Sequence, residues 1–261
     1  VEVTLERVAQ GGYVLAHAMD RTLMVRGGLP GEQVVVSIDH ERGRVLHAHV
    51  VEVVHASPDR VSAPCSLAGR CGGCDLQHVA RPAQLEWKTA MLRDAMRRTG
   101  GVTDDDWERL APRVQQVPGD DSGLGYRTRV QLHVDDQGFV GPYRERSHEV
   151  VRVKTLPLAV EDIQEMSFQT KNYQSVDKIE VMASSTGQIQ WMIDKKLQGD
   201  ERLIERAGGR TFRITGGGFW QVHKKAPDVL TSAVNDFVAK AGIKLEADNL
   251  DLYGGVGLFT G

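Results

Sequence analysis

The sequence predicts a multidomain chain with three parts: a small N-terminal β-barrel, a central α+β region and the opening of a doubly wound α/β domain. Strand-like segments separated by glycine turns fill residues 1–54. Several more strand-like pieces lie between residues 112 and 213, which predicts a mixed α+β region. Near the end, the apolar segment 249–253 runs directly into a glycine-rich turn, as the first strand of a doubly wound fold does.

The first part contains five short strand-like segments. Val1, Val3 and Leu5 alternate with polar residues, with the period of two that is typical of a half-buried strand. Gly11 and Gly12 then turn the chain into the next segment. The five predicted strands occupy residues 1–5, 13–16, 23–25, 34–38 and 45–54. A small closed barrel would leave no exposed sheet edge, and another small β-domain is the alternative that the strand pattern leaves open.

Helices are predicted at two places. Residues 84–99 carry apolar side chains near helical spacing, and Gly100 and Gly101 end that segment. Residues 227–241 follow an Ala-Pro-Asp opening, with proline in the first turn. The last predicted element is a buried strand over residues 249–253. The strand-like pieces of the central region are residues 129–134, 139–143, 150–153, 178–183 and 188–194.

Composition and charge exclude several classes of protein. The 261 residues are 41% hydrophobic, and no apolar run approaches the roughly 18–20 residues of a membrane span. Val1 begins an alternating pattern rather than a leader peptide. The 32 Lys and Arg against 35 Asp and Glu give a net charge of −3, so no global basic field indicates nucleic acid. An odd number of cysteines, three, argues against a secreted disulfide scaffold, and we expect a cytoplasmic protein.

A cysteine-rich loop, CSLAGRCGGC, occupies residues 65–74. Its thiols, Cys65, Cys71 and Cys74, lie within ten residues, and the glycines between the last two let the backbone fold tightly. Three neighbouring thiolates suit an iron–sulfur cluster. They also suit zinc if His78 completes a Cys3His tetrahedron. The third alternative is three buried cysteines without a metal.

Gly255 and Gly257 form a G-x-G pattern in the turn after the last predicted strand. In doubly wound folds this turn brings the backbone close to a nucleotide-like ligand. Thr260 stands where a dinucleotide fingerprint has its third glycine, so a dinucleotide is disfavoured. A shorter ligand such as S-adenosylmethionine is more compatible, but G-x-G alone is a weak signal, and as a pattern it favours an ordinary turn.

Six motifs, taken in chain order, carry a resemblance to a known family. They are GLPGEQV at 28–34, CSLAGRCGGCDLQH at 65–78, GYR at 125–127, GPYR at 141–144, FWQV at 219–222 and DLYGGVGLF at 251–259. The ordered set resembles the bacterial RNA uracil-5-methyltransferases, and it is most similar to those that act on 23S ribosomal RNA. The first motif is similar to the signature of the TRAM domain, a small OB-like RNA-binding β-barrel. The last motif resembles motif I of the Rossmann-like class I methyltransferases.

The resemblance implies five segments along the chain. They are a TRAM-like β-barrel at residues 1–56, a cysteine cluster loop at 57–81, a linker helix at 82–110, a central α+β RNA-binding domain at 111–205 and the beginning of the methyltransferase domain at 206–261.

The resemblance also assigns ligands to an iron–sulfur cluster. Cys65, Cys71 and Cys74 match three ligands of the family's [4Fe–4S] cluster. Leu156 stands where the fourth cysteine is expected. A leucine cannot ligate iron, so the cluster would need another fourth ligand, an open iron site, or would be absent.

The methyl-donor positions that the resemblance implies lie towards the end of the chain. They are Gln221, Tyr253, Gly255, Gly257 and Leu258. In the family, a cysteine thiolate adds to C6 of uridine, C5 then takes a methyl group from S-adenosylmethionine, and a base removes the C5 proton. All three cysteines match cluster ligands. We therefore expect the catalytic cysteine and glutamate to lie outside this chain, and the chain as given to be inactive.

Cations and aromatic rings are interleaved in the central region. The candidates for RNA contact are Arg127, Arg129, Tyr143, Arg144 and Arg146. Single-stranded RNA is commonly held by cations that follow the backbone and by rings that stack on the bases. The alternative is a solvated sheet face on which acidic neighbours balance the arginines.

The function expected from the sequence is methylation of uridine C5 in RNA by S-adenosylmethionine, with 23S ribosomal RNA as the favoured substrate. One alternative is a tRNA-directed enzyme of the same family. The other is a non-catalytic, metal-stabilised RNA-binding module. We expect RNA as the partner, no membrane contact and a monomer.

Overall fold

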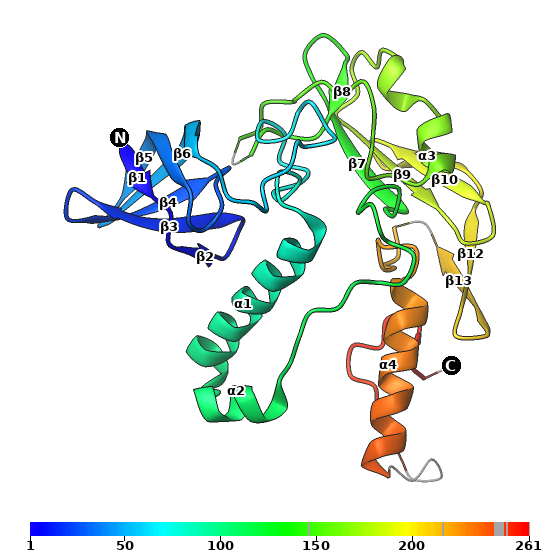
Figure 1. Cartoon of the computed structure of the whole chain (residues 1–261). Helices are drawn as coiled ribbons and strands as arrows, with labels where there is room; N and C mark the ends of the chain where they lie inside the picture. The colour runs from blue at the N-terminus through cyan, green and yellow to red at the C-terminus, as the bar shows by residue number, and fades with distance from the viewer. Residues whose placement is uncertain (146, 216, 243–247, 249, 261) are drawn as a thin grey trace. The chain divides into compact units, whose positions relative to one another are not determined.

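The computed structural model describes residues 1–145, 147–215, 217–242, 248 and 250–260 (Figure 1). The chain divides into two compact units, Val1–Gln116 (unit 1) and Val117–Gly261 (unit 2). Among the described residues, no helix is both long enough and apolar enough to span a bilayer. The finer division into five segments stays a prediction.

Unit 1 contains a six-stranded sheet with the strand order β1-β5-β6-β4-β3-β2. Its strands are β1 (Glu2–Thr4), β2 (Arg7–Ala9), β3 (Tyr13–Ala18), β4 (Arg21–Arg26), β5 (Gln33–Arg42) and β6 (Val45–His55). The pairings are antiparallel except for β4 with β6. The two edge strands, β1 and β2, are joined by only Leu5 and Glu6, so the sheet curls until its edges meet at this corner. The five predicted strands are confirmed, and β2 is an additional one.

The core of unit 1 forms because alternate residues of the strands point inward. Val14 and Ala16 of β3 and Leu23 and Val25 of β4 are completely buried. Trp87, from the following helix, packs against the same core. The helices of this unit are α1 (Arg81–Gly100) and α2 (Asp104–Leu110). The predicted helix over residues 84–99 is confirmed as α1, which ends at Gly101 in the left-handed conformation.

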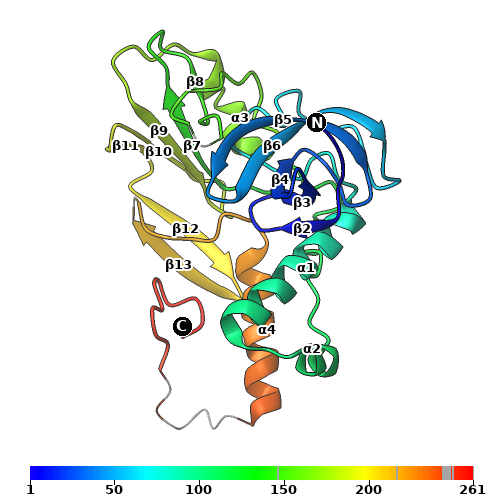
Figure 2. The same cartoon turned by 90° about the vertical axis from the view of Figure 1, so that its left-hand side faces the viewer.

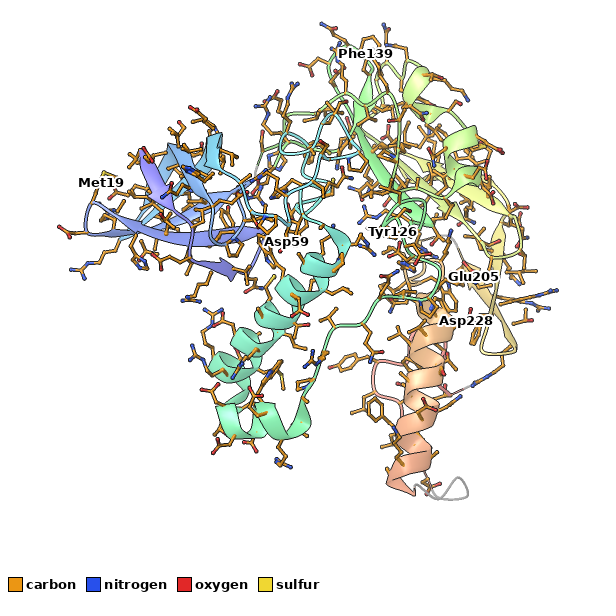
Figure 3. The ribbon with its side chains drawn as sticks, in the orientation of Figure 1. Met19, Asp59, Tyr126, Phe139, Glu205 and Asp228 are labelled. Atoms are coloured by element: carbon orange, nitrogen blue, oxygen red, sulfur yellow. The ribbon has the colours of Figure 1, made fainter. Side chains whose placement is uncertain are left out.

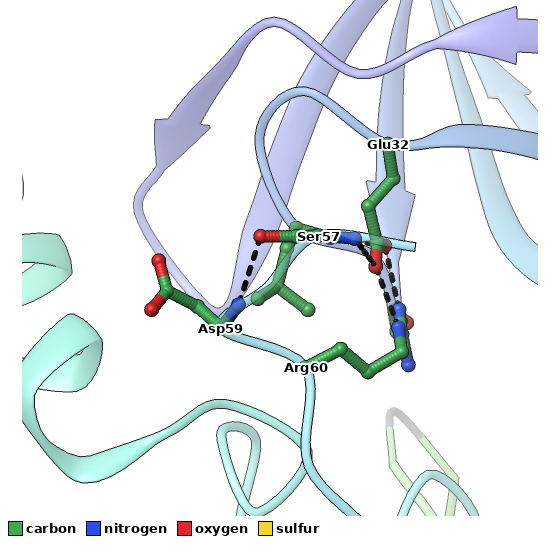
Figure 4. A network of polar contacts seen from close by, with 6 residues as sticks. Glu32, Ser57, Asp59 and Arg60 are labelled. Carbon is green, nitrogen blue, oxygen red and sulfur yellow. Dashed lines mark hydrogen bonds and ion pairs between the residues drawn. The ribbon is translucent and has the colours of Figure 1, made fainter. Parts of the chain in front are cut away.

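A buried ion pair fastens the start of β5 to the segment that follows β6 (Figure 4). Glu32 is completely buried, and its carboxylate accepts hydrogen bonds from Nε and Nη2 of Arg60, each at 2.6 Å. Two backbone N–H groups, of Leu29 at 2.8 Å and Ser57 at 3.1 Å, donate to the same carboxylate. The GLPGEQV motif therefore supplies a buried anion whose hydrogen-bonding capacity is well used.

Unit 2 is built on a five-stranded antiparallel sheet with the order β11-β10-β9-β7-β8. Its strands are β7 (Arg129–Val134), β8 (Val140–Gly141), β9 (Lys178–Ala183), β10 (Ile189–Ile193) and β11 (Lys196–Gly199). One face of the sheet packs against the short helix α3 (Glu161–Glu165) through Ile163, and Phe168 of the following 3-10 turn joins this core. The predicted pieces at 129–134 and 178–183 are confirmed to the residue as β7 and β9.

A second core of unit 2 lies under a β-hairpin, β12 (Arg202–Ala207) with β13 (Arg210–Thr215). Met182 of β9 contributes to this core from the sheet, and Leu203 and Ile214 contribute from the hairpin. Figure 2 shows the hairpin above the C-terminal segment. Helix α4 (Ala226–Ala241) confirms the predicted helix and ends at Gly242 in the left-handed conformation.

Two strand predictions in unit 2 are wrong. Residues 150–153 form no strand: the Val153 N–H donates to the Val140 carbonyl of β8 at 3.2 Å and the Val151 N–H donates to the Pro142 carbonyl just after β8 at 2.9 Å, without a regular ladder. The described part of 249–253 is also not a strand; Asn249 lies outside the described residues. Leu250 and Leu252 are 87% and 76% exposed. A buried strand needs neighbours on both sides, and no described residue of the chain pairs with this segment.

Candidate functional site

The segment that contains Gln221 is fixed to the strand-like stretch before β7. The N–H and hydroxyl groups of Thr128 both donate to the Val222 carbonyl, at 2.8 and 3.1 Å. The Lys224 N–H donates to the Tyr126 carbonyl at 2.9 Å. Gln221 is half-buried in this paired segment. Its backbone position is therefore set by the core sheet rather than by a free loop.

The glycine turn meets the same region at a shared hydrophobic cluster. Leu258 and Trp220 are 8% and 4% exposed and belong to the core under the β12–β13 hairpin. Gly255 and Gly257 have φ of 58° and 80°, the left-handed conformation that favours glycine. Because Trp220 precedes Gln221 directly, the end of the turn and the Gln221 segment are brought together.

Tyr253 is the predicted methyl-donor position that the structure leaves apart from this cluster, since its side chain is fully exposed. Asp251, which the sequence analysis did not single out, instead packs over the turn. One of its carboxylate oxygens is buried without a hydrogen-bond partner among the described residues. A Cβ on Gly254 would lie 2.9 Å from that oxygen, which explains the glycine there. The signal for Asp251 was its place at the head of the DLYGGVG motif.

A pocket of about 890 Å³ opens beside Trp220 in unit 2. Thr128, Ser184 and Glu205 line its wall, and all three are buried. The Glu205 carboxylate accepts a hydrogen bond from the Ser185 N–H at 2.9 Å. The charged lining residues are Glu161, Asp162, Glu165, Glu205 and Lys224. Because carboxylates outnumber cations there, electrostatics disfavours an RNA phosphate in this pocket.

The three cysteines of the unit 1 loop are half-buried and form no disulfide bond among the described residues. Gly73 donates its N–H to the Cys71 sulfur at 3.3 Å, and the side-chain oxygen of Gln77 accepts from the Cys65 N–H at 3.2 Å. Burial, together with the neighbouring charge of Cys65, raises the pKa of the Cys71 thiol. In the described part of the chain, no three His, Cys, Asp or Glu side chains are grouped so as to hold a metal ion.

His78, the fourth ligand of the zinc alternative, and Leu156, which stands where the fourth cluster cysteine is expected, both lie in other surroundings. His78 lies against the Glu32–Arg60 pair, where burial and then the Arg60 charge lower its pKa. Leu156 packs against the apolar core of unit 2 beneath the five-stranded sheet. The donors that this structure presents thus fit neither a four-ligand iron–sulfur cluster nor a Cys3His zinc site, and both expectations are left without support.

The RNA-contact candidates occupy different settings in unit 2. Tyr143 stacks on His133 with ring centroids 3.6 Å apart, and His148 meets its ring edge-on at 5.2 Å. Arg144 is exposed and forms an ion pair of 2.8 Å with Glu149. Arg146 lies outside the described residues. Phe139, labelled in Figure 3, is exposed. The Arg152 guanidinium lies over its ring, 4.3 Å from the ring centroid. The cations of this surface are balanced by carboxylates, as the solvated-face alternative requires.

Arg127 and Arg129 are both partly buried, which limits how far their side chains are accessible to RNA. Nη1 of Arg129 donates to the Gly218 carbonyl at 2.5 Å, and its Nη2 is buried without a hydrogen-bond partner. Burial lowers the pKa of Arg129, and the charge of Glu205 partly opposes that shift. The Nε of Arg127 is buried as well. No observation tests the RNA role of either arginine, and it stays a prediction.

Comparison with known proteins decides the family. A protein of Streptomyces avermitilis described as an uncharacterized RNA methyltransferase is 34% identical over 301 residues, covering 100% of this chain and 68% of that protein. The chain belongs to the RNA methyltransferase family. The family expected from the ordered motifs is thereby confirmed. The chain spans about two thirds of the length of the curated relatives that match all of it.

Other relatives of the chain carry more specific names. The 23S rRNA (uracil(1939)-C(5))-methyltransferase RlmD of Pseudomonas entomophila is 36% identical over 163 residues, covering 61% of this chain and 35% of that protein. Among solved structures, the tRNA (uracil-54, C5)-methyltransferase of Pyrococcus abyssi, in complex with S-adenosyl-L-homocysteine, has the same fold. The match covers 98% of this chain and 69% of the chain of that protein, with a TM-score of 0.65 and 18% sequence identity. No protein-family model matches the chain.

Proposed function

We propose that the whole protein methylates C5 of uridine in RNA with S-adenosylmethionine as methyl donor. The observation that carries the proposal is the meeting of the Gln221 segment and the Gly255–Gly257 turn at the Trp220–Leu258 cluster. Named relatives support it, since one is a 23S rRNA uracil-C5 methyltransferase. The solved neighbour of the same fold carries S-adenosyl-L-homocysteine, the product of methyl transfer.

The methyl donor is proposed to lie between these two segments. The backbone of the turn at Gly255 and Gly257 can approach a ligand closely because neither residue has a Cβ. Gln221 would offer an amide to the polar groups of the donor, and Leu258 would offer an apolar contact. Tyr253, exposed as it is, would provide an aromatic face to the adenine ring. Such a site holds the donor by shape and hydrogen bonds.

The nucleophile and the general base are proposed to come from residues outside 1–261. The three cysteines lie together in the loop of unit 1, and the relatives are longer than this chain. A C5 methyl transfer needs a thiolate to add at C6 and a base to remove the C5 proton. The chain's own contribution would be to hold the methyl donor and the RNA in the relative positions that this reaction needs.

Unit 1 is proposed to be a TRAM-like barrel that binds RNA. Its support is the sheet whose edges meet at Leu5 and Glu6, and the GLPGEQV motif whose glutamate is buried. The favoured substrate is 23S ribosomal RNA, because relatives named for that substrate match about 60% of the chain at 36% and 37% identity. A ribosomal substrate would place the reaction in the cytoplasm.

Nucleoside analysis of cells that lack the protein tests the proposed function. We expect 23S ribosomal RNA from the deletion strain to lose 5-methyluridine at one site, and complementation with the natural gene to restore it. Mass spectrometry of purified 23S and transfer RNA measures this directly. Loss of 5-methyluridine from transfer RNA alone would favour the tRNA-directed alternative. Unchanged 5-methyluridine in both RNAs would contradict the proposal.

A further inference from the structure

His223 lies in a tightly enclosed position just after the Gln221 segment. Its ring stacks on that of Tyr126, with centroids 4.9 Å apart and an interplanar angle of 17°. Its Nε2 lies 3.6 Å from Oδ2 of Asp120, and the two side chains are only 17% and 12% exposed. Figure 3 shows Tyr126 near the N-terminal end of α4. Two side chains, those of Tyr126 and Asp120, thus pack against the imidazole of His223.

The hydrogen bonds around His223 fix which nitrogen carries the proton. The Lys225 N–H donates to Nδ1 at 3.1 Å, so Nδ1 is an acceptor. The proton of the neutral ring therefore sits on Nε2, which faces the Asp120 carboxylate. One imidazole thereby joins the residue just before α4 to the segment around Asp120.

This arrangement controls the position of the backbone at Gln221. Gln221 is two residues before His223, and Val222 between them has its carbonyl bonded to Thr128. On the other side, Trp220 is anchored in the hairpin core. The Gln221 backbone is therefore held at one end by Trp220 and at the other end by the His223 cluster.

We propose that His223, held by Asp120 and Tyr126, is a positioning residue that sets Gln221 against the methyl donor. The inference rests on the proposed donor site and deepens it. The groups that contact the ring include the Asp120 carboxylate, the Tyr126 ring and the Lys225 N–H, and the backbone of His223 pairs with that of Arg127. Protonation of Nδ1 would set two donors, Nδ1–H and Lys225 N–H, against each other. Donor binding should then be weaker in the state with a protonated His223 ring.

Binding of S-adenosyl-L-homocysteine to the natural full-length protein tests this inference by calorimetry. We expect His223→Ala to weaken binding about tenfold, since a loss of about 1.4 kcal/mol corresponds to that factor. His223→Gln keeps an amide oxygen and an N–H group and should recover part of the affinity, without the pH dependence. Val222→Ala is the matched control, because that side chain is 40% exposed and its backbone bonds persist.

The outcomes separate the two proposals. If the wild-type protein fails to bind S-adenosyl-L-homocysteine, the donor site itself is wrong. If the wild-type protein binds and His223→Ala binds equally well, with a pH profile unchanged, the positioning role is wrong even if the variant unfolds at a lower temperature. Nitrogen-15 NMR of the natural full-length protein provides a readout independent of binding. It should show His223 protonated at Nε2 near neutral pH, and the opposite tautomer would overturn the inference.

Discussion

Replacing Glu32 by alanine should destabilise unit 1 by about 3–5 kcal/mol, because it leaves the Arg60 guanidinium without its buried partner. The carboxylate is completely buried and accepts four hydrogen bonds, two from Arg60 and two from backbone N–H groups. Hydrogen exchange at the amides of β5 and β6, followed through a urea titration, measures this loss. A variant as stable as the wild type would show that the ion pair contributes nothing to the fold.

A surface ion pair provides the matched control for Glu32. Glu41 pairs with Arg21 at 3.0 Å, but its side chain is 60% exposed. Exposed pairs are worth about 0–1 kcal/mol, so Glu41→Ala should leave the exchange of β5 and β6 nearly unchanged.

The Glu32 pair also predicts how unit 1 responds to pH. Burial raises the pKa of Glu32, but the hydrogen bonds from Arg60, Leu29 and Ser57 outweigh it, so the pKa lies below the ordinary value of 4.5. The stabilisation is therefore complete above pH 4.5 and is lost as the pH falls through the lower folded-state pKa. Glu32→Gln should remove this part of the acid sensitivity.

Replacing Trp220 by alanine should destabilise unit 2 by about 3–5 kcal/mol, the usual cost of removing a buried tryptophan. Its ring is 4% exposed, lies 5.3 Å from the Phe212 ring and shares a core with Leu258. The cavity left behind would also release the segment that carries Gln221. Hydrogen exchange at the β12 and β13 amides measures the stability change.

Phe219, the aromatic neighbour of Trp220, tests whether the loss of stability comes from burial or simply from removing an aromatic ring. Phe219 is 73% exposed, so Phe219→Ala should change the free energy of unfolding by no more than about 0.5 kcal/mol. If both variants are equally destabilised, the cluster under the β12–β13 hairpin is not the core that the structure describes.

Local periodicity predicted the elements whose partners lie close in sequence. The strands of unit 1 and the helices α1 and α4 follow from alternation, helical spacing and glycine ends. The β12–β13 hairpin had a signal that was overlooked: Gly208 and Gly209 between two alternating segments. Glu205 is buried and faces inward, at a position where alternation predicts an apolar residue. Its charged side chain therefore interrupts the hydrophobic pattern of the strand.

The sequence proposes residues for the candidate site but does not give their geometry. The FWQV and DLYGGVGLF motifs identified Gln221 and Leu258, whereas their meeting at Trp220 depends on a core formed by residues far apart in sequence. The positions around His223 had no sequence signal, because Asp120 and Tyr126 lie about a hundred residues away from it. The metal expectation is left without support for a similar reason. Three cysteines close in sequence do not define a coordination geometry, and Leu156 packs into an apolar core of unit 2.

The central claim is that the whole protein transfers a methyl group to uridine C5 in RNA. The most direct measurement incubates the purified natural protein with a 23S rRNA transcript and S-adenosylmethionine that carries a deuterated methyl group. Mass spectrometry of the digested RNA should show the labelled methyl group on C5 of a single uridine, with loss of the C5 hydrogen. Label on another atom, or no label on RNA from a protein that binds S-adenosyl-L-homocysteine, would contradict the account.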